Sequence, residues 1–178
     1  MNSSRVLWAA IFAATAHKDQ RRLGKLEYPY IVHPLEVAAC LIDAGIQYDD
    51  ILCAAILHDV QEDCSISNEV IFSEFGASVA AYVSEVTDDP ALKGAERKQA
   101  QVEKVQTMSE GARLIKVADK ICNMYDVLYN PPLDWDAKKK ADYFDFGLKV
   151  FNAANVKNKI LSDSFSSLYK AGKFNEQA

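Results

Sequence analysis

The run AAILHDVQED at residues 54–63 leads an apolar segment directly into a cluster of ionisable side chains. Residues 51–57 are apolar nearly all round, which is typical of a buried central helix. His58, Asp59, Glu62 and Asp63 then follow in quick succession. Burying an unpaired charge costs on the order of several kcal/mol, so such a cluster needs a partner. A divalent metal ion suits one imidazole beside carboxylates, and the oxygen ligands favour Mn²⁺ over Fe²⁺ or Zn²⁺.

Helical periodicity recurs on both sides of this run, and sustained period-two alternation is missing. Pro34 is suited to the start of a helix, and Gly76 is suited to the end of one. Pro131-Pro132 predicts a break between helices, and Asp134 could cap the helix that follows. The predicted helices are about 4–19, 34–44, 50–62, 67–75, 77–87, 91–107, 110–128, 134–154 and 157–171. This pattern predicts an all-α fold: a single-domain, irregular helical bundle over residues 1–178, with its core at about 5–155.

Composition narrows the classes of function. The net charge of −5 and the pI near 5.2 argue against general binding to nucleic acid or to an anionic membrane. The four cysteines form no C-x-x-C pair, which disfavours a thiolate zinc site or a disulfide framework and favours a reducing, cytoplasmic location. The apolar run 6–16 loosely mimics a signal peptide, but an amphipathic first helix is the preferred interpretation.

Two further residues are candidate ligands of the same metal ion. His33 stands immediately before a predicted helix, where a histidine that only hydrogen-bonds locally is the simpler interpretation. Asp119 lies beside an apolar stripe of the helix predicted over 110–128 and should face partly inward. A buried carboxylate needs a metal or a paired base, and Lys116 is the alternative partner.

Other polar residues suggest substrate chemistry. Glu62 and Asp63 lie one helical turn after His58 and Asp59, where they could orient a water molecule or carry a proton. Basic residues gather at 18–25, 97–104 and 138–140, and together they could offer a polyphosphate a local positive field. Asn123, one turn after Asp119, could hydrogen-bond a sugar hydroxyl.

The order of His33, His58-Asp59 and Asp119 resembles the H…HD…D metal set of the HD superfamily of metal-dependent phosphohydrolases. The flanking segments resemble RelA/SpoT-type alarmone hydrolases in particular, in order over about residues 5–155. Those segments are 21–22, 29–34, 57–63, 75–76, 86–88 and 114–124. The chain is similar to the stand-alone small hydrolases of the metazoan type, because no synthetase or regulatory domain follows.

The resemblance implies an HD-domain fold and a single Mn²⁺ held by His33, His58, Asp59 and Asp119. It implies removal of the 3′-pyrophosphate from ppGpp or pppGpp to give GDP or GTP and pyrophosphate. Glu62 and Asp63 would serve the attacking water in that metal-assisted hydrolysis.

The same resemblance suggests the substrate contacts. Arg22 would flank the guanine and Asn123 would touch the ribose, while Tyr143 and Lys139 match positions that contact phosphate. Two departures concern base recognition: Leu23 replaces a second basic residue, and the loop at 24–28 is longer than in the bifunctional enzymes.

Three other functions fit the same residues. The site could remove the 2′-phosphate of NADPH, or cut nucleotide monophosphates as other HD proteins do. The chain could instead be a catalytically silent module that binds a nucleotide as a sensor. The presence of all four ligands together with Glu62 and Asp63 favours an enzyme.

Overall fold

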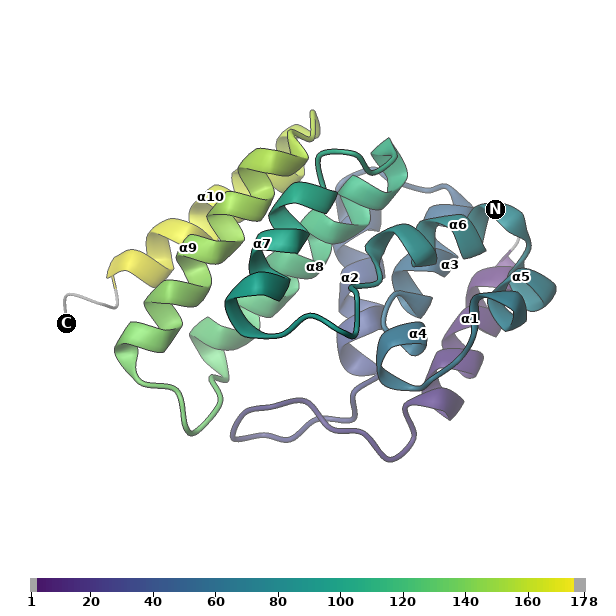
Figure 1. The fold of residues 1–178 in the computed structure, drawn as a ribbon, viewed down its shortest axis with the longest axis horizontal. Coiled ribbons are helices and arrows are strands. Elements are labelled where there is room, and N and C mark those ends of the chain that lie inside the picture. Colours follow the sequence, from purple (N-terminus) through teal and green to yellow (C-terminus); the bar gives the residue numbers. More distant parts are fainter. Residues whose placement is uncertain (1–2, 175–178) are drawn as a thin grey trace.

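The structure is a computed structural model that describes residues 3–174, so residues 1–2 and 175–178 of the expected domain lie outside it. Ten helices occupy the described part of the chain (Figure 1). They are α1 (Ser3–Ala16), α2 (Val32–Asp43), α3 (Asp49–Leu57), α4 (Val60–Asp63), α5 (Asn68–Phe75), α6 (Ala77–Val86), α7 (Gly94–Lys104), α8 (Glu110–Tyr129), α9 (Ala137–Ala154) and α10 (Lys159–Phe174). The predicted all-α bundle is confirmed.

Helices α3 and α8 form the centre of the bundle. Every residue of α3 from Ile51 to Leu57 is buried, because its apolar side chains face neighbours on all sides. It packs against α1, α2, α6 and α8. Helix α8 packs in turn against α2, α6, α9 and α10. The crossing of α2, α3 and α8 therefore places His33, His58 and Asp119 in one buried region. None of the helices within residues 3–174 has the length and apolarity needed to span a membrane.

The prediction of one continuous helix over 50–62 is wrong in one important respect. Helix α3 ends at Leu57, and a separate turn, α4, begins at Val60. Between them the backbone leaves regular helical geometry at Asp59, with φ −100° and ψ −7°. This break lets His58 and its neighbour Asp59 face the same point, whereas a regular helix would separate their directions by about 100°.

The start of α9 also differs from the prediction. Its cap is Asp136, whose carboxylate accepts a hydrogen bond of 2.7 Å from the backbone N–H of Lys139. Asp134, the predicted cap, instead lies 3.3 Å from the ammonium group of Lys139. Both aspartates have capping chemistry, so the choice depends on where the chain leaves the loop after Pro132.

A hairpin loop, residues 20–30, connects α1 to α2. Arg21 and Pro29 form an antiparallel bridge, flanked by backbone hydrogen bonds from Tyr30 to Gln20 (3.0 Å) and from Arg22 to Tyr28 (2.8 Å). The tip rests on the end of α8, where the side-chain oxygen of Asn130 accepts a hydrogen bond of 3.1 Å from Leu26. The basic segment at 18–25 therefore runs into an ordered hairpin that returns the chain to His33.

Candidate metal centre and adjoining pocket

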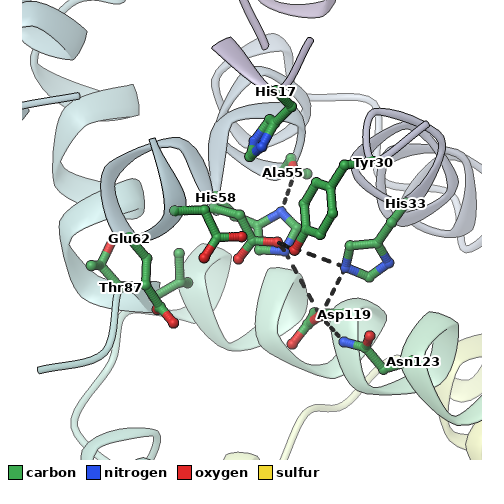
Figure 2. A network of polar contacts seen from close by, with 12 residues as sticks. His17, Tyr30, His33, Ala55, His58, Glu62, Thr87, Asp119 and Asn123 are labelled. Carbon is green, nitrogen blue, oxygen red and sulfur yellow. Dashed lines mark hydrogen bonds and ion pairs between the residues drawn. The ribbon is translucent and has the colours of Figure 1, made fainter. Parts of the chain in front are cut away.

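The four predicted metal ligands converge. His33 comes from α2, His58 and Asp59 from the break after α3, and Asp119 from α8. The Nε2 atom of His33 lies 3.2 Å from Oδ1 of Asp119, and Nε2 of His58 lies 2.9 Å from Oδ2 of Asp59. Donor atoms of His33, His58 and Asp119 all lie within 4.8 Å of one another, and Figure 2 shows these side chains pointing toward one another. This convergence matches the geometry that the sequence motif predicts.

The hydrogen bonding of His58 prepares it to be a metal ligand. Its Nδ1 lies 2.8 Å from the backbone carbonyl of Ala55, which can only accept, so the proton is on Nδ1. The lone pair of Nε2 then faces the cluster. Within residues 3–174 this buried Nε2 atom makes no hydrogen bond of good geometry, although Oδ2 of Asp59 lies 2.9 Å away. A metal-binding histidine is held in this way, so the donor set fits a divalent cation.

The cluster also favours a positive charge electrostatically. Burial lowers the pKa of His58, but the carboxylates of Asp59 and Asp119 together outweigh burial and raise it to about 10. Burial alone would raise the pKa of Asp119. Lys120 and the two imidazoles outweigh burial and hold the pKa of Asp119 well below its usual range. A divalent ion in the cluster would replace the proton that the carboxylates attract onto His58.

Tyr30 is part of this centre, although only its place three residues before His33 distinguishes it in the sequence. Its hydroxyl donates a hydrogen bond of 2.7 Å to Oδ2 of Asp59. Burial, together with the carboxylates of Asp59 and Asp63, raises the pKa of Tyr30 far above its usual value, so the hydroxyl keeps its proton. Tyr30 therefore orients one carboxylate of the cluster.

The lysine partner of Asp119 is Lys120 rather than Lys116. The Lys120 ammonium group lies 3.2 Å from Oδ2 of Asp119, while Oδ1 faces the histidines. Lys116 points toward the end of α6, where it lies 3.6 Å from Asp88 and donates to the carbonyl of Val86. Asp119 thus has one oxygen for the cluster and one for a buried cation.

Glu62 and Asp63 occupy different environments. One oxygen of Glu62 pairs with Arg97 of α7, and the other accepts from the backbone N–H of Asp88 at 3.2 Å. Figure 2 places Glu62 beside Thr87. Asp63 is exposed, and its Oδ2 accepts a hydrogen bond of 2.8 Å from Gln20. Both carboxylates border the centre, but Glu62 is held on two sides whereas Asp63 remains open to solvent.

A pocket of about 440 Å³ adjoins the centre. Tyr30 and Asn123 line it, and each also hydrogen-bonds to a carboxylate of the cluster, Tyr30 to Asp59 and Asn123 to Asp119. The other lining residues are Gln20, Arg21, Arg22, Leu23, Asp126, Val127, Pro132, Trp135 and Tyr143. The pocket therefore borders the candidate metal centre through Tyr30 and Asn123, while the four candidate ligands lie behind its lining.

Three of the four predicted substrate residues line this pocket: Arg22, Asn123 and Tyr143. The Arg22 guanidinium is held by Asp126 at 2.6 Å and by the Asn123 side-chain oxygen at 2.7 Å, and it lies over the Tyr30 ring. Lys139 lies further out. Its ammonium group is 4.9 Å from the ring centre of Trp135, a lining residue, so it stands near the pocket without lining it.

An all-α bundle in which two histidines and two aspartates converge in and beside the core defines the class of HD-type hydrolases. Residues 9–143 match the family described as HD domain. The guanosine-3′,5′-bis(diphosphate) 3′-pyrophosphohydrolase MESH1 of Homo sapiens is 38% identical over 169 residues, covering 94% of each chain. The same-named protein of Drosophila melanogaster is 36% identical over the same share.

A solved structure described as a metazoan ortholog of SpoT that hydrolyzes ppGpp is 35% identical, with a TM-score of 0.91 over 96% of each chain. The chain therefore belongs to the HD domain family. The resemblance to small hydrolases of the metazoan type, first drawn from the motifs around His33, His58 and Asp119, is confirmed.

Proposed function

We propose that this chain is a (p)ppGpp 3′-pyrophosphohydrolase. Water would attack the 3′-pyrophosphate of ppGpp or pppGpp, and the products would be pyrophosphate and GDP or GTP. The single observation that carries the proposal is that a pocket of about 440 Å³ borders the His/Asp cluster, linked to it by the hydrogen bonds of Tyr30 and Asn123. The human and Drosophila relatives, of which this chain covers 94%, are named as guanosine-3′,5′-bis(diphosphate) 3′-pyrophosphohydrolases.

The residues that would hold the metal are His33, His58, Asp59 and Asp119. The donor set fits a divalent cation, and we propose Mn²⁺ because carboxylates make up half of it. Such an ion, when bound, supplies a Lewis acid for a phosphoryl oxygen and for water.

Asp63 is the better placed of the two candidate bases. Its side chain is exposed and, among residues 3–174, accepts a hydrogen bond from Gln20 through Oδ2, so the carboxylate can align a water molecule and accept a proton. Glu62 would contribute by fixing the short turn α4 through Arg97 and Asp88. The two neighbouring carboxylates thus divide orientation and proton transfer between them.

The pocket residues would hold the nucleotide. Arg22, already fixed by Asp126, offers a flat cation against the base, and Asn123 offers an amide to the ribose. Tyr143 and, at the outer edge, Lys139 would contact the phosphates. Leu23 lines the same pocket and would give the base an apolar contact in place of a second cation.

Product analysis with Mn²⁺ tests the proposed function. The metal-depleted protein would be incubated with ppGpp, pppGpp or NADPH, with and without Mn²⁺, and the products separated by anion-exchange chromatography. We expect pyrophosphate and GDP or GTP only when Mn²⁺ is present, and EDTA should stop the reaction. Release of orthophosphate from NADPH alone would replace the proposal with a 2′-phosphatase. Binding of ppGpp without any product would replace it with a nucleotide sensor.

Arg22→Met is expected to raise KM for ppGpp by about tenfold and to change kcat much less, because the lost contact holds the base in substrate and transition state alike. Steady-state kinetics at saturating Mn²⁺ measures both constants. Lys18→Met is the matched control, since Lys18 is an exposed cation near Arg22 in the sequence. An unchanged KM in Arg22→Met would remove Arg22 from substrate binding.

A further inference from the structure

Gln20 and Tyr30 face each other at the base of the hairpin loop. The backbone N–H of Tyr30 donates to the carbonyl of Gln20 at 3.0 Å, and the Arg21–Pro29 bridge continues the pairing. Residues far apart along the loop are thus fixed side by side by the main chain. Their side chains can act on neighbouring targets as one unit.

The two carboxylates that Tyr30 and Gln20 contact are also held at a fixed distance from each other by the main chain. Asp59 and Asp63 are one turn apart, and the N–H of Asp63 donates to the carbonyl of Asp59 at 2.8 Å. The Tyr30 hydroxyl donates to Asp59 at 2.7 Å, and the Gln20 amide donates to Asp63 at 2.8 Å. Tyr30 and Gln20, paired in the hairpin, therefore hold the carboxylates of Asp59 and Asp63, which lie at the two ends of α4.

His17 locks both donors in place. It is only 2% exposed, and its ring stacks on the Tyr30 ring with centroids 4.7 Å apart. Its Nδ1 lies 2.6 Å from the side-chain oxygen of Gln20, and this contact turns the amide nitrogen of Gln20 toward Asp63. Figure 2 shows His17 and Tyr30 beside the cluster. One buried imidazole thus sets the orientation of both side chains.

We propose that Gln20 and Tyr30, held by His17, form a two-point clamp that positions the carboxylates of Asp59 and Asp63 separately. The Tyr30 bond sets the direction of a metal ligand, and the Gln20 bond sets the direction of the proton acceptor. The proposal rests on the function proposed above for these carboxylates. It assigns positioning roles to three residues that the metal motif does not include.

The Tyr30 arm is tested with Mn²⁺ alone. Tyr30→Phe keeps the ring and removes only the hydroxyl, and we expect Mn²⁺ affinity to fall by about 10- to 100-fold, as is usual when a residue that orients a metal ligand is lost. Isothermal titration calorimetry on the metal-depleted protein measures it. Tyr125→Phe, the same change at an exposed site on α8, should leave the affinity at the wild-type value. No nucleotide is needed, so this result stands whether or not ppGpp is the substrate.

Loss of the hydrogen bond from Gln20 is expected to change kcat rather than Mn²⁺ affinity. Gln20→Leu should keep Mn²⁺ affinity and KM and lower kcat for ppGpp by about tenfold, because Asp63 loses its fixed direction while the cluster is intact. His17→Phe can still stack on Tyr30 but cannot bond to Gln20. It should therefore reproduce the kinetics of Gln20→Leu without the loss of Mn²⁺ affinity seen in Tyr30→Phe.

Two results would overturn the clamp. Wild-type Mn²⁺ affinity in Tyr30→Phe would show that its hydroxyl does not position a metal ligand. Parallel losses of Mn²⁺ affinity, kcat and unfolding temperature in all three variants would show that the residues only support the fold. Separate losses, Mn²⁺ affinity in one variant and kcat in the other two, are the result that a clamp requires. If ppGpp is not hydrolysed, the kcat readings fail and the Mn²⁺ titrations still decide the Tyr30 arm.

Discussion

Asp119→Asn is expected to abolish Mn²⁺ binding and to lower kcat/KM for ppGpp by on the order of a thousandfold or more. Asp119 lies between the other ligands, with Oδ1 3.2 Å from His33 and 3.8 Å from His58. Asparagine has nearly the same shape but no charge. The change therefore removes the electrostatic attraction for a cation while the side chain still fills its buried place.

Calorimetric titration with Mn²⁺ and measurement of pyrophosphate release test this expectation together. Asp163→Asn, on the exposed face of α10, is the matched control and should behave as the wild type. Unfolding curves in EDTA show whether the substituted protein keeps its fold. A folded Asp119→Asn protein that binds Mn²⁺ normally would refute the assignment of the metal centre.

Asp63→Asn is expected to lower kcat by about 10²- to 10⁴-fold with Mn²⁺ affinity unchanged, the range typical for loss of a group that transfers a proton. The asparagine oxygen can still accept the hydrogen bond from Gln20, so the side chain keeps its place and loses only its basicity. The expected pattern thus separates proton transfer from metal binding.

Glu62→Gln provides the comparison for Asp63→Asn, because it alters the neighbouring carboxylate by the same chemistry. Glu62 is held by Arg97 and Asp88, so this variant should weaken the support of α4 and cost less rate than Asp63→Asn. Rapid-quench measurements at saturating Mn²⁺ and ppGpp would compare the chemical steps directly. A larger loss in Glu62→Gln than in Asp63→Asn would reverse the roles proposed for the pair.

Much of the fold followed from local sequence patterns. Apolar residues on all sides of α3, and the apolar stripe of α8 beside Asp119, predict which helices are central and which way the carboxylate faces. The proline pair after α8 and the glycine before α6 predict helix boundaries because they act through the local backbone. The H…HD…D order, through its resemblance to the HD superfamily, pointed to the four residues that converge in the structure.

Features that depend on contacts between distant segments could not be predicted. The break at Asp59 arises where its carboxylate meets Tyr30 and His58, and no local propensity marks it. Lys116 and Lys120 are both one turn or less from Asp119, so only the packing of α6 against α8 decides which lysine pairs with it. The pairing of Gln20 with Asp63 likewise joins positions that no short-range pattern connects.

Within the described part of the chain, the hairpin loop holds the catalytic carboxylates at its base only, and its tip makes no hydrogen bond to them. Gln20 and Tyr30 stand at its base, whereas the tip begins at Leu23, which lines the pocket, and continues to Leu26, which bonds to Asn130. Insertions or exchanges at the tip can therefore reshape the pocket at Leu23 while the base still holds the carboxylates. New substrate preferences can evolve there by changes of loop length alone, with the hydrolytic apparatus inherited intact.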